Sequence, residues 1–289
     1  MRNNLFAVAL ASTVFLSQTA CGAENPRTVQ TQSGPIAVQV VASDLDDPWA
    51  VAFLPDGRML VTQRSGQIRI VTRSGQVSAP IAGVPAVYSS GQGGLLDIAL
   101  APDFAMSRFV YFSFGEPGDG GATTAVARAR FADDRLQDTT VIFRALPRTG
   151  GGAHFGSRLA FGRDGTLFVT TGERFQFDPS QDLSGHLGKV LRINGDGSVP
   201  ANNPFVGRNG ARPEIWSYGH RNVEGAAIHP ETGKLWTHEM GPAGGDELNI
   251  TEAGRNYGWP LVSWGRHYGG AAIPAPTTGP DFGESIPHW

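Results

Sequence analysis

The chain has 289 residues, of which 40% are hydrophobic and 9% aromatic, so it can build a sizeable core and is not disordered as a whole. Its formal net charge of −3 argues against a general nucleic-acid binder. The single cysteine excludes an internal disulfide and a cysteine-rich metal site.

The N-terminus has the pattern of an export signal. Arg2 precedes an apolar run from 5 to 16, which is too short to span a bilayer and suits a signal-peptide core. We expect residues 1–23 to be a signal peptide, 24–34 a flexible leader and 35–289 the folded domain. Cleavage before Cys21 with lipidation, or ordinary cleavage near Ala23, both stay open. Either way the sequence predicts an exported protein, periplasmic or anchored to the outer membrane as a lipoprotein.

The rest of the chain repeats a β-rich run, a tight turn with Pro, Asp or Gly, and a second β-rich run. The paired runs are 50–53 with 59–62, 96–100 with 109–112, 159–161 with 167–170, and 226–228 with 234–236. Because one hairpin cannot bury its faces alone, these repeats predict an all-β fold of the β-propeller type. Further strand material at 36–41 and after Trp259 suggests about five blades, with the C-terminal blades missing. We expect 36–41 to pair with a late blade.

Long loops between these runs carry the residues that could do chemistry. His154, in a glycine-rich loop, could be a general base or an ordinary surface histidine. Arg221 and Asn222 offer a forked cation and an amide to a ligand with carboxylate or carbonyl groups, although a structural ion pair would equally account for Arg221. Gln92 could bind a ligand or cap its own turn. The acidic loop from 239 to 249 offers calcium-type oxygen ligands without the spacing of an EF-hand.

In their order along the chain, these loops resemble those of the soluble quinoprotein sugar dehydrogenases, particularly the bacterial aldose sugar dehydrogenases that use pyrroloquinoline quinone (PQQ). The matching segments are PWAVAFLPDGRMLVTQRSGQI, GQGGLLDIALAPDF, HFGSRLAFGRDGTLFVTTGER, YGHRNVEGAAIHPETGKLW and EMGPAGGDELN with GRNYGWP. The resemblance implies a six-bladed β-propeller with calcium, and PQQ over its central axis. It also implies oxidation of the anomeric hydroxyl of an aldose to a lactone by hydride transfer to PQQ, with an unidentified electron acceptor.

The same resemblance implies roles for individual residues near the cofactor. His154 matches the base that takes the proton of the sugar hydroxyl. Arg221 matches a residue that contacts PQQ and stabilises the charge that develops on it. Gln92, Asn222 and Tyr268 match further PQQ contacts.

Calcium ligands are implied in the same way. Glu247 and Tyr257 match calcium-binding positions of the aldose dehydrogenase branch, and Tyr257 would contribute its backbone carbonyl. Gly241 and Pro242 match backbone ligands of the calcium beside PQQ in the glucose dehydrogenase branch.

Two positions depart from the glucose dehydrogenase branch. Ala153 stands where that branch has an acidic residue before the base, and Arg174 stands where it has a glutamine. Both favour the aldose dehydrogenase branch. Two other functions stay open, a calcium-dependent propeller hydrolase such as a lactonase and a binding propeller without catalysis.

Overall fold

The computed structural model describes residues 26–276, 282 and 285–286. The expected signal peptide, 1–23, and Cys21 lie outside the described residues. Contacts divide the chain into one unit that ends at Val41 and a second that begins at Ala42. The described residues are almost entirely strand and loop, with one short helix, α1 (Phe104–Ser107), and one 3-10 turn, η1 (Asp178–Ser180). None of these helices has the length and apolar character of a membrane span.

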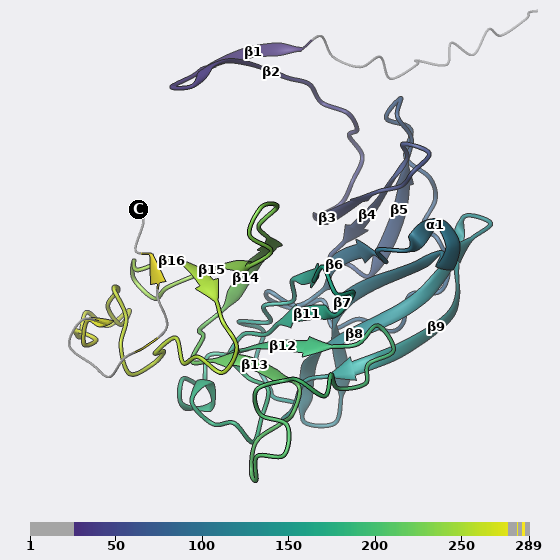
Figure 1. The fold of residues 1–289 in the computed structure, drawn as a ribbon. Coiled ribbons are helices and arrows are strands. Elements are labelled where there is room, and N and C mark those ends of the chain that lie inside the picture. Colours follow the sequence, from purple (N-terminus) through teal and green to yellow (C-terminus); the bar gives the residue numbers. More distant parts are fainter. Residues whose placement is uncertain (1–25, 277–281, 283–284, 287–289) are drawn as a thin grey trace, which may run out of the picture. The chain divides into compact units, whose positions relative to one another are not determined.

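The first unit contains a two-stranded antiparallel hairpin of β1 (Arg27–Thr31) and β2 (Gly34–Val38) (Figure 1). Strand β1 falls inside the expected leader, 24–34, and β2 covers the first part of the expected strand 36–41. The determinants of the hairpin are local: β-branched residues occupy both strands, and the Thr31 hydroxyl donates to the Gly34 carbonyl across the turn (2.6 Å).

The second unit consists of four antiparallel sheets that follow one another along the chain (Figure 1). In order within each sheet, the strands are β3 (Pro48–Phe53), β4 (Met59–Gln63) and β5 (Gln67–Val71); β6 (Leu95–Leu100), β7 (Phe109–Gly118), β8 (Gly121–Ala132) and β9 (Arg135–Arg144); β10 (Leu159–Phe161), β11 (Leu167–Thr170), β12 (Lys189–Ile193) and β13 (Ile215–Tyr218); β14 (Val223–Ile228), β15 (Leu235–Glu239), β16 (Glu247–Thr251) and β17 (Ser285–Ile286). Each of the four predicted hairpins is confirmed as the first pair of strands in one sheet. The sequence predicts about five blades; among the described residues the second unit has four sheets, and the late strand β17 pairs with β16 of the fourth.

The turns between first and second strands close through side chains that bond their own backbone. Asp56 accepts the N–H of Arg58 at 2.9 Å, and Asp164 accepts the N–H of Thr166 at 3.1 Å. Each is an Asx-type turn, in which a short acidic side chain replaces a backbone acceptor. Turn chemistry of this kind is local, so the sequence alone predicts where each hairpin reverses.

The first strands of the four sheets are spatial neighbours in chain order. Strand β3 contacts β6, β6 contacts β10, and β10 contacts β14. Within each hairpin the start of the first strand lies opposite the end of the second, as Val223 lies opposite Glu239. Loops that precede a first strand and loops that follow a second strand are therefore brought together at one end of the sheets.

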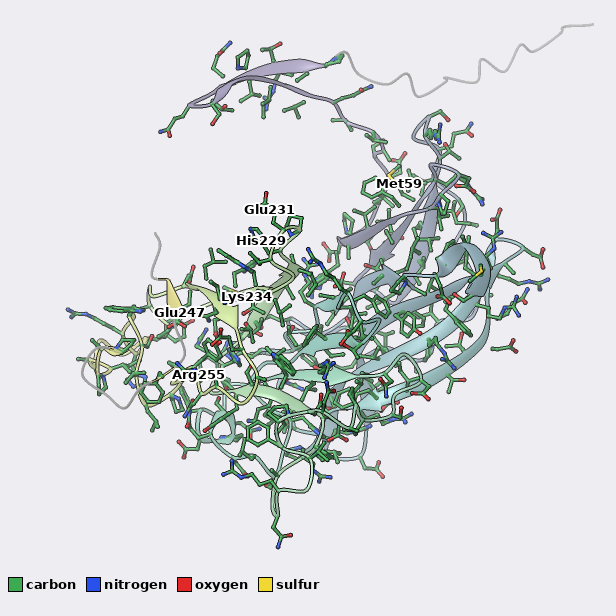
Figure 2. The ribbon with its side chains drawn as sticks, in the orientation of Figure 1. Met59, His229, Glu231, Lys234, Glu247 and Arg255 are labelled. Carbon is green, nitrogen blue, oxygen red and sulfur yellow. The ribbon has the colours of Figure 1, made fainter. Side chains whose placement is uncertain are left out.

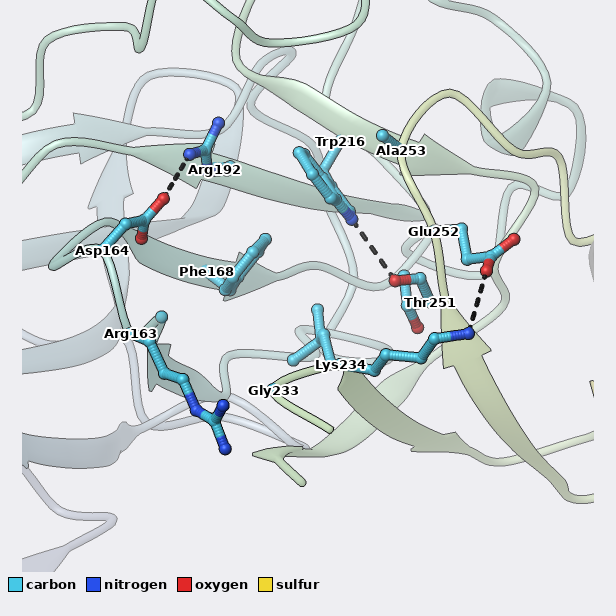
Figure 3. Close-up of a pocket in the computed structure, with 12 residues that line it drawn as sticks. Arg163, Asp164, Phe168, Arg192, Trp216, Gly233, Lys234, Thr251, Glu252 and Ala253 are labelled. Carbon is cyan, nitrogen blue, oxygen red and sulfur yellow. Dashed lines mark hydrogen bonds and ion pairs between the residues drawn. The ribbon is translucent and has the colours of Figure 1, made fainter. Parts of the chain in front are cut away.

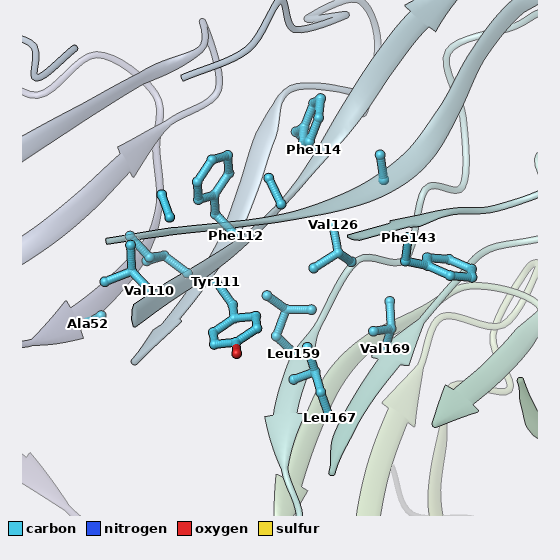
Figure 4. Packing of buried hydrophobic residues seen from close by; sticks show 14 of the residues in the cluster. Ala52, Val110, Tyr111, Phe112, Phe114, Val126, Phe143, Leu159, Leu167 and Val169 are labelled. Carbon is cyan, nitrogen blue, oxygen red and sulfur yellow. The ribbon is translucent and has the colours of Figure 1, made fainter. Parts of the chain in front are cut away.

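A hydrophobic core joins the sheets of the second unit (Figure 4). Phe112 and Phe114 on β7 are fully buried, and Tyr111 packs edge-on against Phe161 of the third sheet with 5.0 Å between ring centroids. Side chains that alternate along β7 thus reach neighbouring sheets, and packing between sheets, rather than within one hairpin, stabilises the unit.

Phe112→Ala tests this core. Removing a fully buried phenyl leaves a cavity between sheets and should lower the free energy of unfolding by about 3–5 kcal/mol. Phe53→Ala is the matched control, because that ring is 70% exposed and its loss should change stability by less than about 0.5 kcal/mol. Urea denaturation monitored by tryptophan fluorescence measures both, and equal losses would contradict the assignment of the core.

Candidate active site

His154 and Glu173 form a buried pair at the end of the third sheet. His154 precedes β10, Glu173 follows β11, and Nδ1 lies 2.7 Å from Oε1. The Glu173 side chain is fully buried, and that of His154 is 5% exposed. Because an ionised carboxylate only accepts, we assign the imidazole proton to Nδ1. Nε2 then keeps its lone pair, and no described residue bonds it.

Gln92 holds the backbone of His154. The Oε1 of Gln92 accepts the backbone N–H of His154 at 2.6 Å. The backbone N–H of Gln92 donates to the Gly152 carbonyl at 2.6 Å. The loops meet this closely because Gly91 has φ +62°, and a Cβ there would overlap the backbone of Gly152. The structure therefore brings together two residues that the sequence singled out separately.

Asn222 braces the same loop from the fourth sheet. It is fully buried, its Oδ1 accepts the Gly156 N–H at 3.0 Å, and its Nδ2 donates to Glu224 Oε1 at 2.8 Å. Gly172 lies between the elements, and a Cβ there would overlap both the His154 carbonyl and Asn222 Oδ1. In this structure Asn222 positions the loop that carries the histidine.

Arg221 connects the fourth sheet to the loops that follow it. Nη1 donates to the carbonyls of Met240 (2.9 Å) and Gly241 (2.7 Å), and Nη2 donates to the Tyr268 hydroxyl (3.1 Å). Its Nε is buried and has no hydrogen-bond partner among the described residues. An unpaired N–H on a buried cation is costly, so the group is suited to an oxygen of a bound ligand.

Glu239, which the sequence analysis did not single out, organises a second buried histidine. Its Oε1 lies 2.8 Å from His220 Nδ1 and accepts from Asn249 Nδ2 at 2.9 Å, while its Oε2 accepts the Arg221 N–H at 2.6 Å. His220 Nε2 is bonded to the Ser217 hydroxyl at 2.8 Å. Both nitrogens of His220 are thus in use, which distinguishes it from His154.

A small cavity of about 10 Å³ lies beside this network and suits a single ion or water. Glu239, Gly241 and Glu247 are among its lining residues, and Glu247 begins strand β16 (Figure 2). Burial and the charge of Glu239 raise the pKa of Glu247. Asn249 Oδ1 is buried without a partner. Asn249 Nδ2 donates to both carboxylates, at 2.9 Å to Glu239 and 3.4 Å to Glu247. Two carboxylates held this close, with the Gly241 carbonyl, are oxygen donors of the type that fits a hard cation such as calcium.

Of the other predicted calcium ligands, Gly241 lines this cavity, whereas Pro242 and Tyr257 are not among its lining residues. The described residues contain no group of three or more His, Cys, Asp or Glu that could hold a metal. The Tyr257 ring stacks on His220 with centroids 4.7 Å apart, and its hydroxyl donates to a backbone carbonyl, which leaves its own carbonyl as the candidate ligand. Pro242 is half-buried beside Gly241, whose carbonyl already accepts from Arg221.

The loop after Glu173 has strained backbone. Arg174, Phe175 and Phe177 all have φ near +60°, a conformation that costs non-glycine residues on the order of 1–3 kcal/mol each. Glu173 holds the loop in place, because its Oε2 accepts the N–H groups of Gln176 and Phe177 (3.1 Å for the latter). One carboxylate therefore fixes both the histidine and the strained loop.

Arg174 locks this loop to the one that carries the histidine. Its guanidinium donates to the carbonyls of Ala122 (2.9 Å), Gly151 (2.6 Å) and Ala153 (2.8 Å), and it lies 3.7 Å from the centroid of Phe155. Burial lowers the pKa of Arg174 to about 10. The sequence marked this residue only as a departure from the glucose dehydrogenase branch.

A larger cavity, of about 430 Å³, lies between the third and fourth sheets near their hairpin turns (Figure 3). Phe168 and Trp216 pack edge-on along it, with the Arg192–Asp164 ion pair at one side. Burial opposes ionisation of Asp164, but hydrogen bonds from Thr166 and Arg192 prevail and lower its pKa to about 2. None of the candidate site residues lines this cavity.

A repeated spacing could have revealed the two acidic residues from the sequence. Glu173 follows His154 by 19 residues, and Glu239 follows His220 by the same 19. In each case the histidine precedes the first strand of a sheet; Glu239 ends the second strand, and Glu173 follows the second strand by three residues. A hairpin of this length returns the chain to its starting edge.

The comparisons with known proteins agree with the sequence resemblance. The sequence model of the family described as Glucose / Sorbosone dehydrogenase matches residues 45–289. The chain is 49% identical over 243 residues to the aldose sugar dehydrogenase YliI of Escherichia coli, a match that covers 83% of this chain and 66% of that protein. It is 33% identical over 299 residues to quinoprotein glucose dehydrogenase B of Acinetobacter calcoaceticus, covering 91% and 61%.

The solved structures that resemble this chain include aldose sugar dehydrogenases. The apo-form of the soluble aldose sugar dehydrogenase from Escherichia coli superimposes with a TM-score of 0.79 at 48% identity, covering 81% of this chain and 69% of that one. The PQQ-bound form of the aldose sugar dehydrogenase from Streptomyces coelicolor gives 0.70 at 36% identity, covering 82% and 69%. The chain thus spans about two thirds of the length of the proteins that it matches.

Glu173→Gln tests the double role of the carboxylate. A glutamine can still accept from His154 Nδ1, but its NH₂ group would face the N–H groups of Gln176 and Phe177. Losing bonds to a charged acceptor is worth about 1.5–3 kcal/mol, so these two amides should exchange hydrogen about tenfold faster or more. Hydrogen exchange by mass spectrometry measures this, with β7 peptides as the internal control. Unchanged exchange in peptides that cover 174–178 would refute the role.

Proposed function

This chain belongs to the Glucose / Sorbosone dehydrogenase family, and we propose that it oxidises the anomeric hydroxyl of aldose sugars to lactones, with PQQ as hydride acceptor and calcium as an assisting ion. The observation that carries the proposal is the His154–Glu173 pair, which leaves Nε2 of a neutral imidazole free. Gln92 and Asn222 brace the same loop from two other sheets. Such an arrangement suits a proton acceptor of fixed position.

The residues present fit PQQ, a flat quinone with several carboxylates. Arg221 offers a buried Nε without a partner, and the hydroxyl of Tyr268 lies beside its Nη2. Gln92 uses its oxygen on His154, so its amide nitrogen is left for a ligand. Asn222, by contrast, spends its oxygen inside the protein and acts mainly through the loop that it braces. When bound, PQQ supplies the quinone carbonyl that accepts the hydride.

His154 has a defined step in this proposal. The anomeric hydroxyl gives its proton to Nε2 while the hydride leaves the same carbon, and the C–O bond becomes the carbonyl of the lactone. Glu173 accepts the Nδ1–H throughout, which fixes the ring and stabilises the imidazolium that forms. Arg221 places its positive charge where negative charge develops on the acceptor.

Calcium would be held at the cavity beside Glu239. Glu247, the unpaired Asn249 Oδ1 and the carbonyls of Gly241, Pro242 and Tyr257 are the candidate ligands. When bound, the ion acts as a Lewis acid beside the cofactor. Its charge would also relieve the repulsion between the two buried carboxylates.

The proposal also includes a β-propeller fold and a location outside the cytoplasm. The contacts of β3 with β6, β6 with β10 and β10 with β14 support the four sheets as successive blades of a β-propeller. The count of six blades stays a prediction from the resemblance. Export to the periplasm, or a lipid anchor at Cys21, stays a prediction from the sequence, and the natural electron acceptor is unidentified.

One assay separates the candidate functions. The protein should oxidise glucose with a dye acceptor only when PQQ and calcium are both added. Calcium-dependent opening of a lactone without oxidation would instead favour a hydrolase, for which the Glu239–Glu247 pair is the available carboxylate site. Sugar binding without either reaction would favour a binding propeller.

His154→Ala should lower turnover by about 10²–10⁴-fold, the usual contribution of a positioned base, and retain PQQ binding. The matched control is His229→Ala, in the β14–β15 turn, which should keep full activity (Figure 2). Near wild-type turnover without His154 would remove the base from the mechanism.

Arg221→Ala should differ from the histidine variant by weakening PQQ binding and turnover together, because its contact is made both before and during hydride transfer. PQQ titration monitored by absorbance, followed by steady-state kinetics, measures the two effects. A variant that binds PQQ normally would contradict the proposed contact.

Glu247→Ala should weaken calcium binding and abolish the stabilisation that calcium gives. For the wild type, calcium at a hundred times its dissociation constant should add about 2.7 kcal/mol to the free energy of unfolding. Glu231→Ala, on the exposed turn, is the matched control (Figure 2). Thermal unfolding with calcium and with chelator measures the effect, and a wild-type curve that is unmoved by chelator would disprove the site.

A further inference from the structure

We propose that Phe175 is a specificity-determining residue on which the sugar substrate stacks while its anomeric hydroxyl faces His154; this rests on the proposed function. The Phe175 ring is 46% exposed, and its centroid lies 5.0 Å from that of His154. It is thus a large, partly exposed apolar surface immediately beside the ring of His154.

An exposed phenyl ring is common on protein surfaces and means little by itself. Here the backbone is held in a strained form to present it. Phe175 has φ +61° between Arg174 at +60° and Phe177 at +61°. Glu173 and the three carbonyls bonded by Arg174 hold the segment in this form. Strained backbone that its surroundings hold in place is typical of functional sites, where it fixes the position of a side chain.

The ring neighbours both groups that the proposed reaction uses. Its centroid lies 5.0 Å from that of His154. The Tyr268 ring is parallel to Phe175 within 7°, with centroids 6.1 Å apart, and its hydroxyl accepts from Arg221. A substrate that gives its proton to His154 and its hydride to an acceptor beside Arg221 would therefore lie near Phe175.

The chemistry of the ring favours a pyranose. One face of a pyranose carries C–H groups that pack on the electron-rich face of an aromatic ring, while its hydroxyls at the edge remain free to bond polar groups. Phe175 has no hydrogen-bonding group, so it would select for that apolar face and leave the choice of hydroxyl pattern to other residues. The expected ligand class is a neutral aldopyranose.

Kinetics of Phe175→Ala test the role. Loss of the stack should raise KM for glucose about 3–10-fold and leave kcat within about twofold, because stacking serves substrate and transition state alike. Phe175→Trp should restore KM, and PQQ affinity should be unchanged in both variants. Phe53→Ala, on β3, is the matched exposed phenylalanine and should match wild type. Unchanged KM, or a fall in kcat alone, would mean that Phe175 only packs against the base.

Binding without turnover separates this inference from the proposed function. In a His154→Asn protein with PQQ and calcium, saturation of the aromatic protons should transfer to the ring C–H protons of glucose, and Phe175→Ala in the same background should remove most of that transfer. Phe175-dependent transfer in a protein whose wild type oxidises no aldose would uphold the stacking site and refute the activity. Absence of transfer, or transfer that is independent of Phe175, would overturn the stacking site.

Discussion

The candidate site depends on the hydrogen bonds of the Glu173 carboxylate. One oxygen fixes the ring of His154, and the other holds the backbone of the loop that carries Phe175. The side chain is fully buried, so an unpaired charge there would be strongly destabilising. Both sets of bonds must therefore persist together, so His154 and the apolar surface beside it are held in a fixed relation.

The same arrangement recurs in the next sheet with a different outcome. Glu239 fixes His220 as Glu173 fixes His154, at the same separation along the chain. The second ring nitrogen of His220, however, is hydrogen-bonded to the Ser217 hydroxyl. The second oxygen of Glu239 accepts the backbone N–H of Arg221. One hairpin geometry thus yields a histidine that can take a proton and another that only holds its neighbours.

The sequence predicts the hairpins well because their determinants are local. Asp56 and Asp164 each close a turn with a residue two positions away, and alternating apolar residues on either side define the strands. It does not predict which loops meet, because that depends on packing between sheets. Gln92 and His154 are 62 residues apart, and only the approach of Gly91 to Gly152 joins them. Asn222 and Gly156 are likewise distant in the chain, and their hydrogen bond also depends on packing between sheets.

The strained loop from 174 to 177 is held in place by two buried charged side chains, Glu173 and Arg174. Three residues with positive φ, Arg174, Phe175 and Phe177, would relax if their anchors were lost, and the anchors are the Glu173 carboxylate and the Arg174 guanidinium. Loss of the carboxylate would also free the His154 ring to change tautomer, which would place the proton on Nε2, the nitrogen proposed to accept one. One carboxylate, Glu173, thus holds both the His154 ring and the strained loop. The next residue, Arg174, holds the same loop through the carbonyls that its guanidinium bonds.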